Sequence, residues 1–233
     1  MFKIKIKEQV FTSLEEFGRN IYLYPEACET LLTSTKFLKA LADENKELFE
    51  KLVAINHEFR DVNAFLFHVQ YLFCPHMELK HHGYSFNNLK ELGKQILEFG
   101  PKVDVYLKDF LKFRLLSKYM KDQGYDTRKS YVYNRVLELE ELFFENENKA
   151  YFLLGFLLAE TDNIIFDNEE YTNVSDFFEH MITDYYIVNY SHNLESNQYI
   201  YAWLEVKGLK NEINKYRALI NTIEQLEGKW WKS

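Results

Sequence analysis

The chain has 233 residues, of which 47% are hydrophobic and 17% aromatic, and its formal net charge is −8. This length and composition allow a substantial buried core, and the 8 glycines and 3 prolines are typical of long helices with few irregular loops. Two cysteines exclude a disulfide framework, the first residues lack the apolar core of a signal peptide, and the longest uncharged apolar run, 150–159, is shorter than the roughly 20 residues that cross a bilayer. We therefore expect a cytoplasmic protein with no membrane contact.

One helix-start motif occurs three times in the chain. The copies span 11–21, 86–96 and 171–181. Each copy has a residue suited to an N-cap, whose side-chain oxygen accepts a backbone N–H, and an acidic residue three positions later. The N-cap candidates are Ser13, Asn88 and Asn173. Apolar residues follow at helical spacing, so each copy predicts the start of an amphipathic helix.

A short β-hairpin is expected before each copy of the motif. The upstream segments align without gaps, and Gly83 and Asn168 fall at one aligned position, where a tight turn favours these residue types. The sequence therefore predicts a mainly α protein of three tandem units, each a short β-hairpin plus capped amphipathic helices, packed into one helical body. These repeat units span 1–76, 77–161 and 162–233, with no linker between them. Whether the three hairpins join into one sheet stays open.

Further helices are expected between the copies. Pro25 opens one of them, because proline is well suited to a first helical turn. Strongly apolar helices are expected over 62–73 and 148–160. After the stop signal Gly100-Pro101, a single long helix is expected over 103–120.

The order of an apolar helix, a short hairpin and then Phe-x-Ser-Leu-Glu-Glu-Phe-Gly resembles the helical repeat modules attached to bacterial heat-shock-chaperone-like and zinc-ribbon proteins. Residues 11–18 and 86–93 carry the resemblance. The third copy departs from it, with Phe178 where the other copies have Gly18 and Gly93. The resemblance implies a module for protein interaction without catalytic residues.

Five of the seven histidines, together with Cys74, fall within 57–82. Thiolate and imidazole are the ligands that Zn²⁺ prefers, so these residues offer an alternative metal site. That zinc set would be Cys74, His76, His81 and His82. The spacings match no standard zinc finger or zinc ribbon, and His81 and His82 fall at a predicted turn, where polar residues are expected without a metal.

Sequence motifs of common enzyme classes are missing. The chain has no glycine-rich nucleotide loop, no Gly-x-Ser-x-Gly and no His-Glu-x-x-His, since Phe59, Arg60 and Asp61 follow His57-Glu58. We therefore expect a protein that is not an enzyme and that uses no cofactor.

Acidic residues are concentrated in the segment 138–184, which has 13 of them and one basic residue. One interpretation is a set of solvated helix faces; the other is a surface that mimics nucleic acid and docks on a basic partner. Tyrosines around 189–197 either fill the core or add to an interface. The candidate partner-binding residues are Glu138, Glu141, Glu145, Asp167, Glu169, Glu170, Tyr185, Tyr186 and Tyr190.

These observations predict a non-enzymatic protein-interaction or adaptor protein built of helical repeats. One alternative is an acidic inhibitor, of phage or mobile-element type, that blocks a nucleic-acid-handling protein complex. Another is a zinc-binding protein that uses the histidine cluster 57–82. The expected partner is another protein, in the first alternative a basic nucleic-acid-binding one, with no direct contact to nucleic acid. Trp230 and Trp231 either fold back onto the body or anchor the partner.

Overall fold

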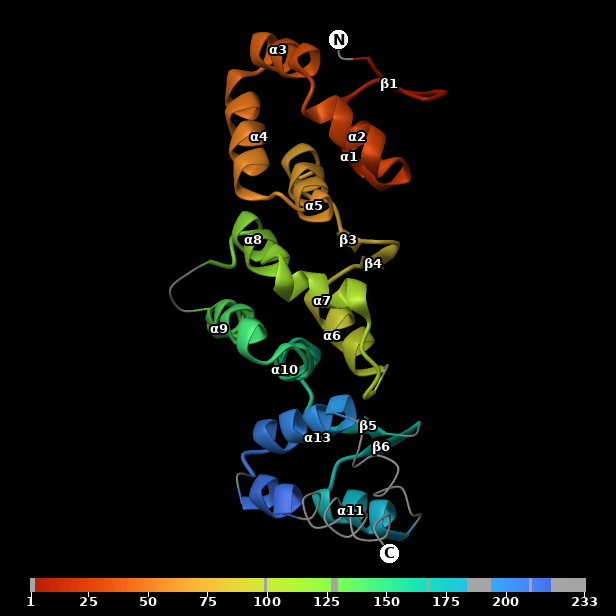
Figure 1. Cartoon of the computed structure of the whole chain (residues 1–233), viewed down its shortest axis with the longest axis vertical. Helices are drawn as coiled ribbons and strands as arrows, with labels where there is room; N and C mark the ends of the chain where they lie inside the picture. Colours follow the sequence, from red (N-terminus) through yellow and green to blue (C-terminus); the bar gives the residue numbers. More distant parts are fainter. Residues whose placement is uncertain are drawn as a thin grey trace, which may run out of the picture. The chain divides into compact units, whose positions relative to one another are not determined.

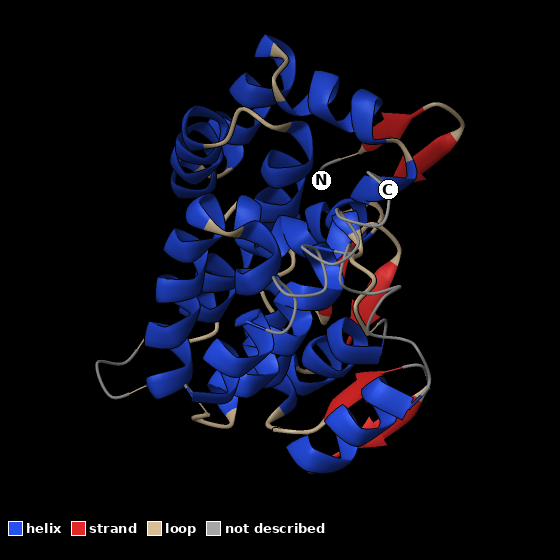
Figure 2. Ribbon diagram, turned by 60° about the horizontal axis from the view of Figure 1, so that its bottom comes forward, coloured by secondary structure: helices blue, strands red, loops and turns tan. Residues whose placement is uncertain are grey.

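The computed structural model of the protein describes residues 3–98, 100–126, 130–166, 168–183, 194–209 and 211–218. It is mainly helical with small antiparallel β-hairpins, which confirms the predicted class (Figures 1 and 2). Each hairpin is a two-stranded sheet of its own, so the described strands do not join into one sheet. The chain divides into two compact units, which we call unit 1 (1–85 and 113–133) and unit 2 (86–112 and 134–233). The three-unit repeat organisation stays a prediction.

Unit 1 is built around one helix that is buried almost along its whole length. The elements of this part of the chain are β1 (Ile4–Ile6), β2 (Gln9–Phe11), α1 (Leu14–Arg19), the 3-10 helix η1 (Ile21–Leu23), α2 (Pro25–Leu32), α3 (Thr35–Glu44), α4 (Lys46–Glu58), α5 (Val62–Phe73), β3 (Leu79–His81), β4 (Tyr84–Phe86) and α8 (Leu115–Asp122). Helix α5 has the predicted bounds, and α1, α2, α4 and α8 pack against it. A helix that is apolar on all sides has to be covered on all sides, which explains its central position.

Unit 2 is also organised around a helix that is apolar after its first turn. Its elements are α6 (Leu89–Glu98), α7 (Val105–Lys112), α9 (Tyr131–Glu145, which begins at the unit boundary), α10 (Glu147–Ala159), β5 (Ile164–Phe166), β6 (Glu169–Tyr171), α11 (Val174–Thr183) and α13 (Leu194–Val206). Helices α6 and α13 pack against the buried α10. The indole Nε1 of Trp203, on α13, donates to the carbonyl oxygen of Asp162 at 2.7 Å, and the Trp203 ring contacts Phe177 edge-on. These contacts fix α11 and the hairpin β5–β6 to α13.

Helices α6 and α10 cross at a contact between their backbones. A Cβ placed on Gly93 of α6 would lie 2.2 Å from the backbone nitrogen of Ala159. From the other helix, a Cβ on Gly155 would lie 2.6 Å from Cγ2 of Ile96. The two glycines therefore permit a closer approach than any pair of residues with side chains would allow.

The repeated motif starts its helices as predicted, with one difference. The Ser13 hydroxyl accepts the backbone N–H of Glu16 at 3.0 Å, so Ser13 is the N-cap of α1. A capping box would have the Glu16 carboxylate accept the N–H of Ser13. The carboxylate instead accepts the N–H of Thr12 at 2.7 Å and also the Thr12 hydroxyl. It therefore ties the end of the hairpin to the first turn of the helix, and these two hydrogen bonds lower the pKa of the Glu16 carboxyl.

Replacing Ser13 with alanine is expected to lower the free energy of unfolding by about 1 kcal/mol, because the N–H of Glu16 loses its acceptor. The measurement is urea unfolding followed by circular dichroism. Ser85→Ala, the same chemical change at an exposed strand position, is the control and is expected to stay within roughly 0.5 kcal/mol of wild type. Equal effects of the two substitutions would contradict the capping role.

The prediction of one long helix over 103–120 was wrong. Two helices are present, α7 and α8, and Arg114 between them has a φ of 53°, in the left-handed region. A residue in this conformation ends the regular ladder of helical hydrogen bonds. The break coincides with the passage of the chain from unit 2 back to unit 1.

Candidate functional site

Helix α9 carries three of the predicted partner-binding residues on one exposed face. Glu138, Glu141 and Glu145 are exposed, and the opposite side of the helix buries Val136, Leu139 and Phe143. The three glutamates recur at intervals of three and four residues, which places them along one stripe of a helix. The structure thus brings these three predicted residues together.

Two large apolar side chains share this exposed side of α9. Leu137 is 39% exposed and Phe144, seven residues and two helical turns further on, is 66% exposed. We call Leu137, Glu138, Glu141, Phe144 and Glu145 the α9 face. The apolar part of this face was not among the residues predicted from the sequence, because apolar residues at helical spacing are more often part of a core.

The α9 face is negatively charged. Arg135 forms an ion pair with Glu138 one turn along the helix, with side chains 35% and 61% exposed. A pair as exposed as this is weak and leaves the carboxylate accessible to a partner.

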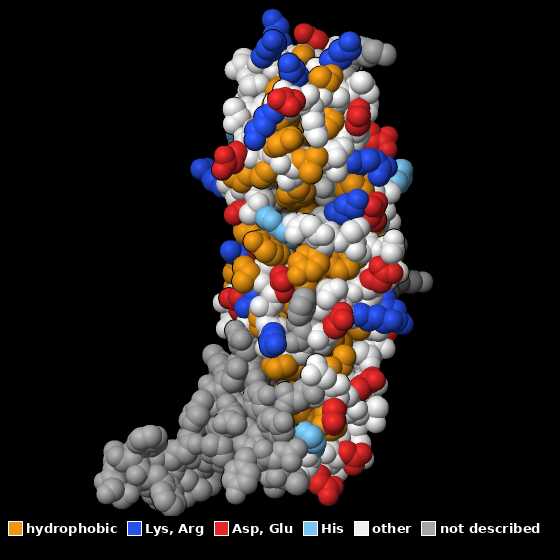
Figure 3. All heavy atoms as spheres, turned by 90° about the vertical axis from the view of Figure 1, so that its right-hand side faces the viewer, with side chains coloured by type: hydrophobic (Ala, Val, Ile, Leu, Met, Phe, Trp, Pro, Cys, Tyr) orange, Lys and Arg blue, Asp and Glu red, His pale blue; other side chains and the backbone are white. Residues whose placement is uncertain are grey.

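The predicted residues of the third hairpin take part in local hydrogen bonds. The Glu169 carboxylate accepts the Tyr171 hydroxyl at 2.8 Å, and the Glu170 carboxylate accepts the Asn163 amide at 2.8 Å. Both glutamates are exposed, and among the side chains that Figure 3 draws in colour over the lower part of the face, several are acidic and none is lysine or arginine. Their described contacts lie within the hairpin and α11, and none joins them to the α9 face.

Several predicted residues lie outside the described part of the chain. These are Asp167, Tyr185, Tyr186, Tyr190, Trp230 and Trp231. Among the tyrosines that the structure does describe, Tyr199 is fully buried, and its hydroxyl accepts the backbone N–H of Ile165 at 3.2 Å. This ring belongs to the core and not to an interface.

The candidate zinc ligands have different surroundings. The Cys74 thiol is buried and donates to the carbonyl oxygen of Glu15 at 3.0 Å, and burial raises its pKa. His76 is exposed. The rings of His81 and His82 are 4.5 Å apart, centroid to centroid, and both contact the Tyr22 ring. Within the described residues, neither Cys74 nor His76 belongs to a group of three possible ligand atoms.

Another histidine of the cluster, His68, is part of the core of unit 1. It is 3% exposed and stacks on Phe59 with ring centroids 4.0 Å apart. Its Nε2 is buried without a hydrogen-bond partner among the described residues. Burial, and secondarily the positive charge of Lys118, lower its pKa to about 3. The imidazole is therefore neutral at physiological pH, and it lines a groove of about 430 Å³ between α4, α5 and α8.

The described helices include none that is long and apolar enough to cross a membrane. Comparison of the chain with protein-family models, with curated proteins and with solved structures gave no match.

Proposed function

We propose that this protein is a non-enzymatic, cytoplasmic binding protein that docks on another protein through the α9 face. One observation carries the proposal: Phe144, a large aromatic side chain, is 66% exposed and lies beside a stripe of glutamates. Large exposed apolar side chains with polar residues at their rim are typical of protein-interaction sites. The predicted adaptor function is compatible with this arrangement.

The chemistry of the α9 face defines the partner it suits. Leu137 and Phe144 are two turns apart on one helix, which is the spacing of the apolar anchors of a helix that lies in a groove. The glutamates beside them call for lysine or arginine at the rim of that groove. The partner we propose is a protein with an apolar groove bordered by basic residues.

The inhibitor alternative is a special case of the same interaction. It is favoured by the acidic composition of 138–184, where 13 acidic residues face one basic residue. If the basic groove of the partner normally holds nucleic acid, this protein would compete with that nucleic acid, and the complementary charges would speed its association. Displacement of labelled DNA or RNA from the purified partner distinguishes an inhibitor from an adaptor.

The test is affinity purification from the native host with three forms of the protein. These are wild type, Phe144→Ala, and Val105→Ala, a control at an equally exposed apolar residue of α7. We expect wild type and the control to recover the same protein, and Phe144→Ala to bind it at least 10-fold more weakly in a subsequent titration, a loss typical of an interface anchor. Equal recovery by all three forms would show that the α9 face is not the interface.

A charge reversal tests the electrostatic part of the proposal. The double variant Glu138→Lys, Glu145→Lys is expected to slow association with the recovered partner about 10-fold at low salt and to remove most of the salt dependence. The control is Glu47→Lys, Glu50→Lys on α4, a change of the same charge at exposed residues of unit 1. An association rate of wild type that does not respond to salt would contradict an acidic docking surface.

A further inference from the structure

A groove of about 430 Å³ lies in unit 1, with α5 as its floor and α4 and α8 as its walls, since both helices pack on α5 (Figure 1). We call it the His68 groove. The lining residues of each helix recur at helical spacing and so form one stripe, with Leu48 and Ile55 as apolar members on α4 and Leu72 on α5. The volume lies within the range of small-molecule sites and allows a ligand of about one or two rings.

One buried polar group of the His68 groove has unused hydrogen-bonding capacity. His68 is 3% exposed and lines the groove, and its Nε2 has no hydrogen-bond partner among the described residues. The hydroxyl of Tyr71, which also lines the groove, already donates to the carbonyl oxygen of Glu78 and accepts the N–H of Lys80, both at 2.8 Å. A buried nitrogen without a partner is costly, so a ligand that supplies a hydrogen bond to His68 gains affinity there.

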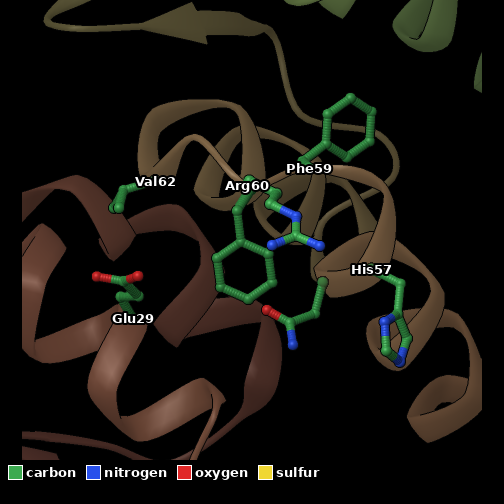
Figure 4. Close-up of a pocket in the computed structure, with 7 residues that line it drawn as sticks. Glu29, His57, Phe59, Arg60 and Val62 are labelled. Atoms are coloured by element: carbon green, nitrogen blue, oxygen red, sulfur yellow. The ribbon is translucent and has the colours of Figure 1, made fainter.

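Two aromatic rings cover the imidazole of His68. Phe59 stacks on it with ring centroids 4.0 Å apart, and Phe67 contacts it edge-on at 5.4 Å. Figure 4 shows Phe59 on the connection between α4 and α5, with its ring turned away from Glu29 and Val62. Neither phenylalanine side chain can form a conventional hydrogen bond with the imidazole, so the missing partner has to come from the groove.

The charges around the groove favour a neutral ligand. The lining has two lysines and two acidic residues. Both lysines have a carboxylate partner, at 2.7 Å for Lys51 with Glu47 and at 3.9 Å for Lys118 with Asp122. Burial in the first place, and then the charge of Lys118, lower the pKa of the His68 imidazole to about 3, so the imidazole itself is neutral. A charged ligand would have to leave water without a free counter-charge beside it.

A hydroxyl group suits His68 better than other neutral groups do. A neutral imidazole has one donor and one acceptor nitrogen, and a hydroxyl, which both donates and accepts, can pair with either tautomer. An aromatic ring suits the remainder of the groove, because it would leave water against Ile55 and Leu72 and pack beside the ring of Tyr71.

We propose that the His68 groove binds a small neutral aromatic molecule with a hydroxyl group, a phenol. The hydroxyl forms a hydrogen bond with the imidazole of His68, and the ring lies against Ile55, Leu72 and Tyr71. The site includes no residue of the α9 face and does not depend on the function proposed for that face.

The test uses three probes: phenol, toluene, which has a methyl group in place of the hydroxyl, and benzoate, which has a charge. Binding to the full-length protein is measured by isothermal titration calorimetry and by ligand-observed NMR. We expect phenol to bind about 10-fold more tightly than either of the other two, because toluene lacks the hydrogen bond and benzoate has no free counter-charge. Absence of saturable phenol binding up to about 10 mM, or binding of toluene or benzoate as tight as that of phenol, would overturn the proposal.

Two variants assign the site. His68→Phe keeps an aromatic ring against Phe59 and is expected to reduce the affinity for phenol to that for toluene, with toluene binding unchanged. Ala54→Phe fills the groove from an exposed residue of α4 and is expected to weaken phenol and toluene alike, about 10-fold or more. Since Ala54 is exposed, this variant tests the site even if His68→Phe is unstable.

The controls are His57→Gln, at an exposed histidine of α4, and Ala42→Phe, the same change on α3, both outside the lining of the groove. Both are expected to bind phenol as wild type does. Phenol binding by Ala54→Phe as tight as that by Ala42→Phe would place the ligand elsewhere and refute the assignment. Thermal unfolding of each variant verifies that the substitutions leave the fold intact.

Discussion

Gly93→Ala is expected to lower the free energy of unfolding by about 2–3 kcal/mol, although glycine to alanine in the middle of a helix normally stabilises by about 1 kcal/mol. The added methyl group would lie 2.2 Å from the nitrogen of Ala159 and 2.6 Å from the carbonyl carbon of Leu158. Both are backbone atoms, so no change of side-chain rotamer relieves the overlap. Helices α6 and α10 have to move apart, and the closest contact in the core of unit 2 opens.

Two other buried glycines provide a graded comparison. A Cβ on Gly155 would meet side-chain atoms of Ile96 and Leu97, and one on Gly18 would meet Sγ of Cys74 at 2.9 Å. Side chains can adjust, so Gly155→Ala and Gly18→Ala are expected to cost less than Gly93→Ala. Lys94→Ala, at the exposed neighbouring position of α6, is the control and is expected to change stability by less than roughly 0.5 kcal/mol. Chemical denaturation measures all four, and a Gly93→Ala variant as stable as the control would contradict the close crossing.

The second large effect concerns His68 and pH. The pKa of its imidazole is about 3 in the folded protein, mainly because burial disfavours the charged form. The ordinary value of histidine, about 6.5, applies to the unfolded chain. Between these two pH values the unfolded state binds more protons than the folded state. The contribution of His68 to the free energy of unfolding is therefore present in full above pH 6.5 and is lost as the pH falls toward 3. At pH 5 the loss caused by this one residue is expected to be roughly 2 kcal/mol.

The measurement compares urea unfolding at pH 7.5 and pH 5 in wild type and in His68→Phe, which keeps an aromatic ring against Phe59. The substitution removes the titrating group, so the fall in stability between the two pH values is expected to shrink by roughly 2 kcal/mol. His57→Gln removes an exposed histidine of α4 and is expected to keep the pH dependence of wild type. An unchanged pH dependence in His68→Phe would mean that the buried imidazole is not the group responsible.

Local sequence signals predicted most of the fold. The bounds of α5 follow from an apolar run between the N-cap Asp61 and Pro75, and each hairpin lies before a capped helix where the repeated motif placed it. The break between α7 and α8 could not be predicted in this way. Residues 103–120 have a continuous amphipathic pattern, and the left-handed conformation of Arg114 is one that its residue type does not favour.

The candidate sites were predictable only in part. The spacing of Glu138, Glu141 and Glu145 was sufficient to place them on one helix face. The exposure of Phe144 was not predictable from its residue type. Its position in the helix does indicate it, because Phe144 comes one residue after the buried Phe143 and therefore points to a different side of the helix. The His68 groove brings together residues 74 positions apart, from Leu48 to Asp122, and no local pattern encodes such a meeting.

The interleaving of the two units has a consequence for the order in which they can fold on the ribosome. Helix α5 is made early, but its partner α8 comes from the segment 113–133, after α6 and α7 of the other unit. Unit 1 therefore stays incomplete while 48 further residues are synthesised, which takes about 2–10 s at ordinary elongation rates. During that interval, the side of α5 that carries His68 is not yet covered by α8. A nascent chain arrested before residue 113 is expected to be more sensitive to protease in α5 than one arrested well after residue 133.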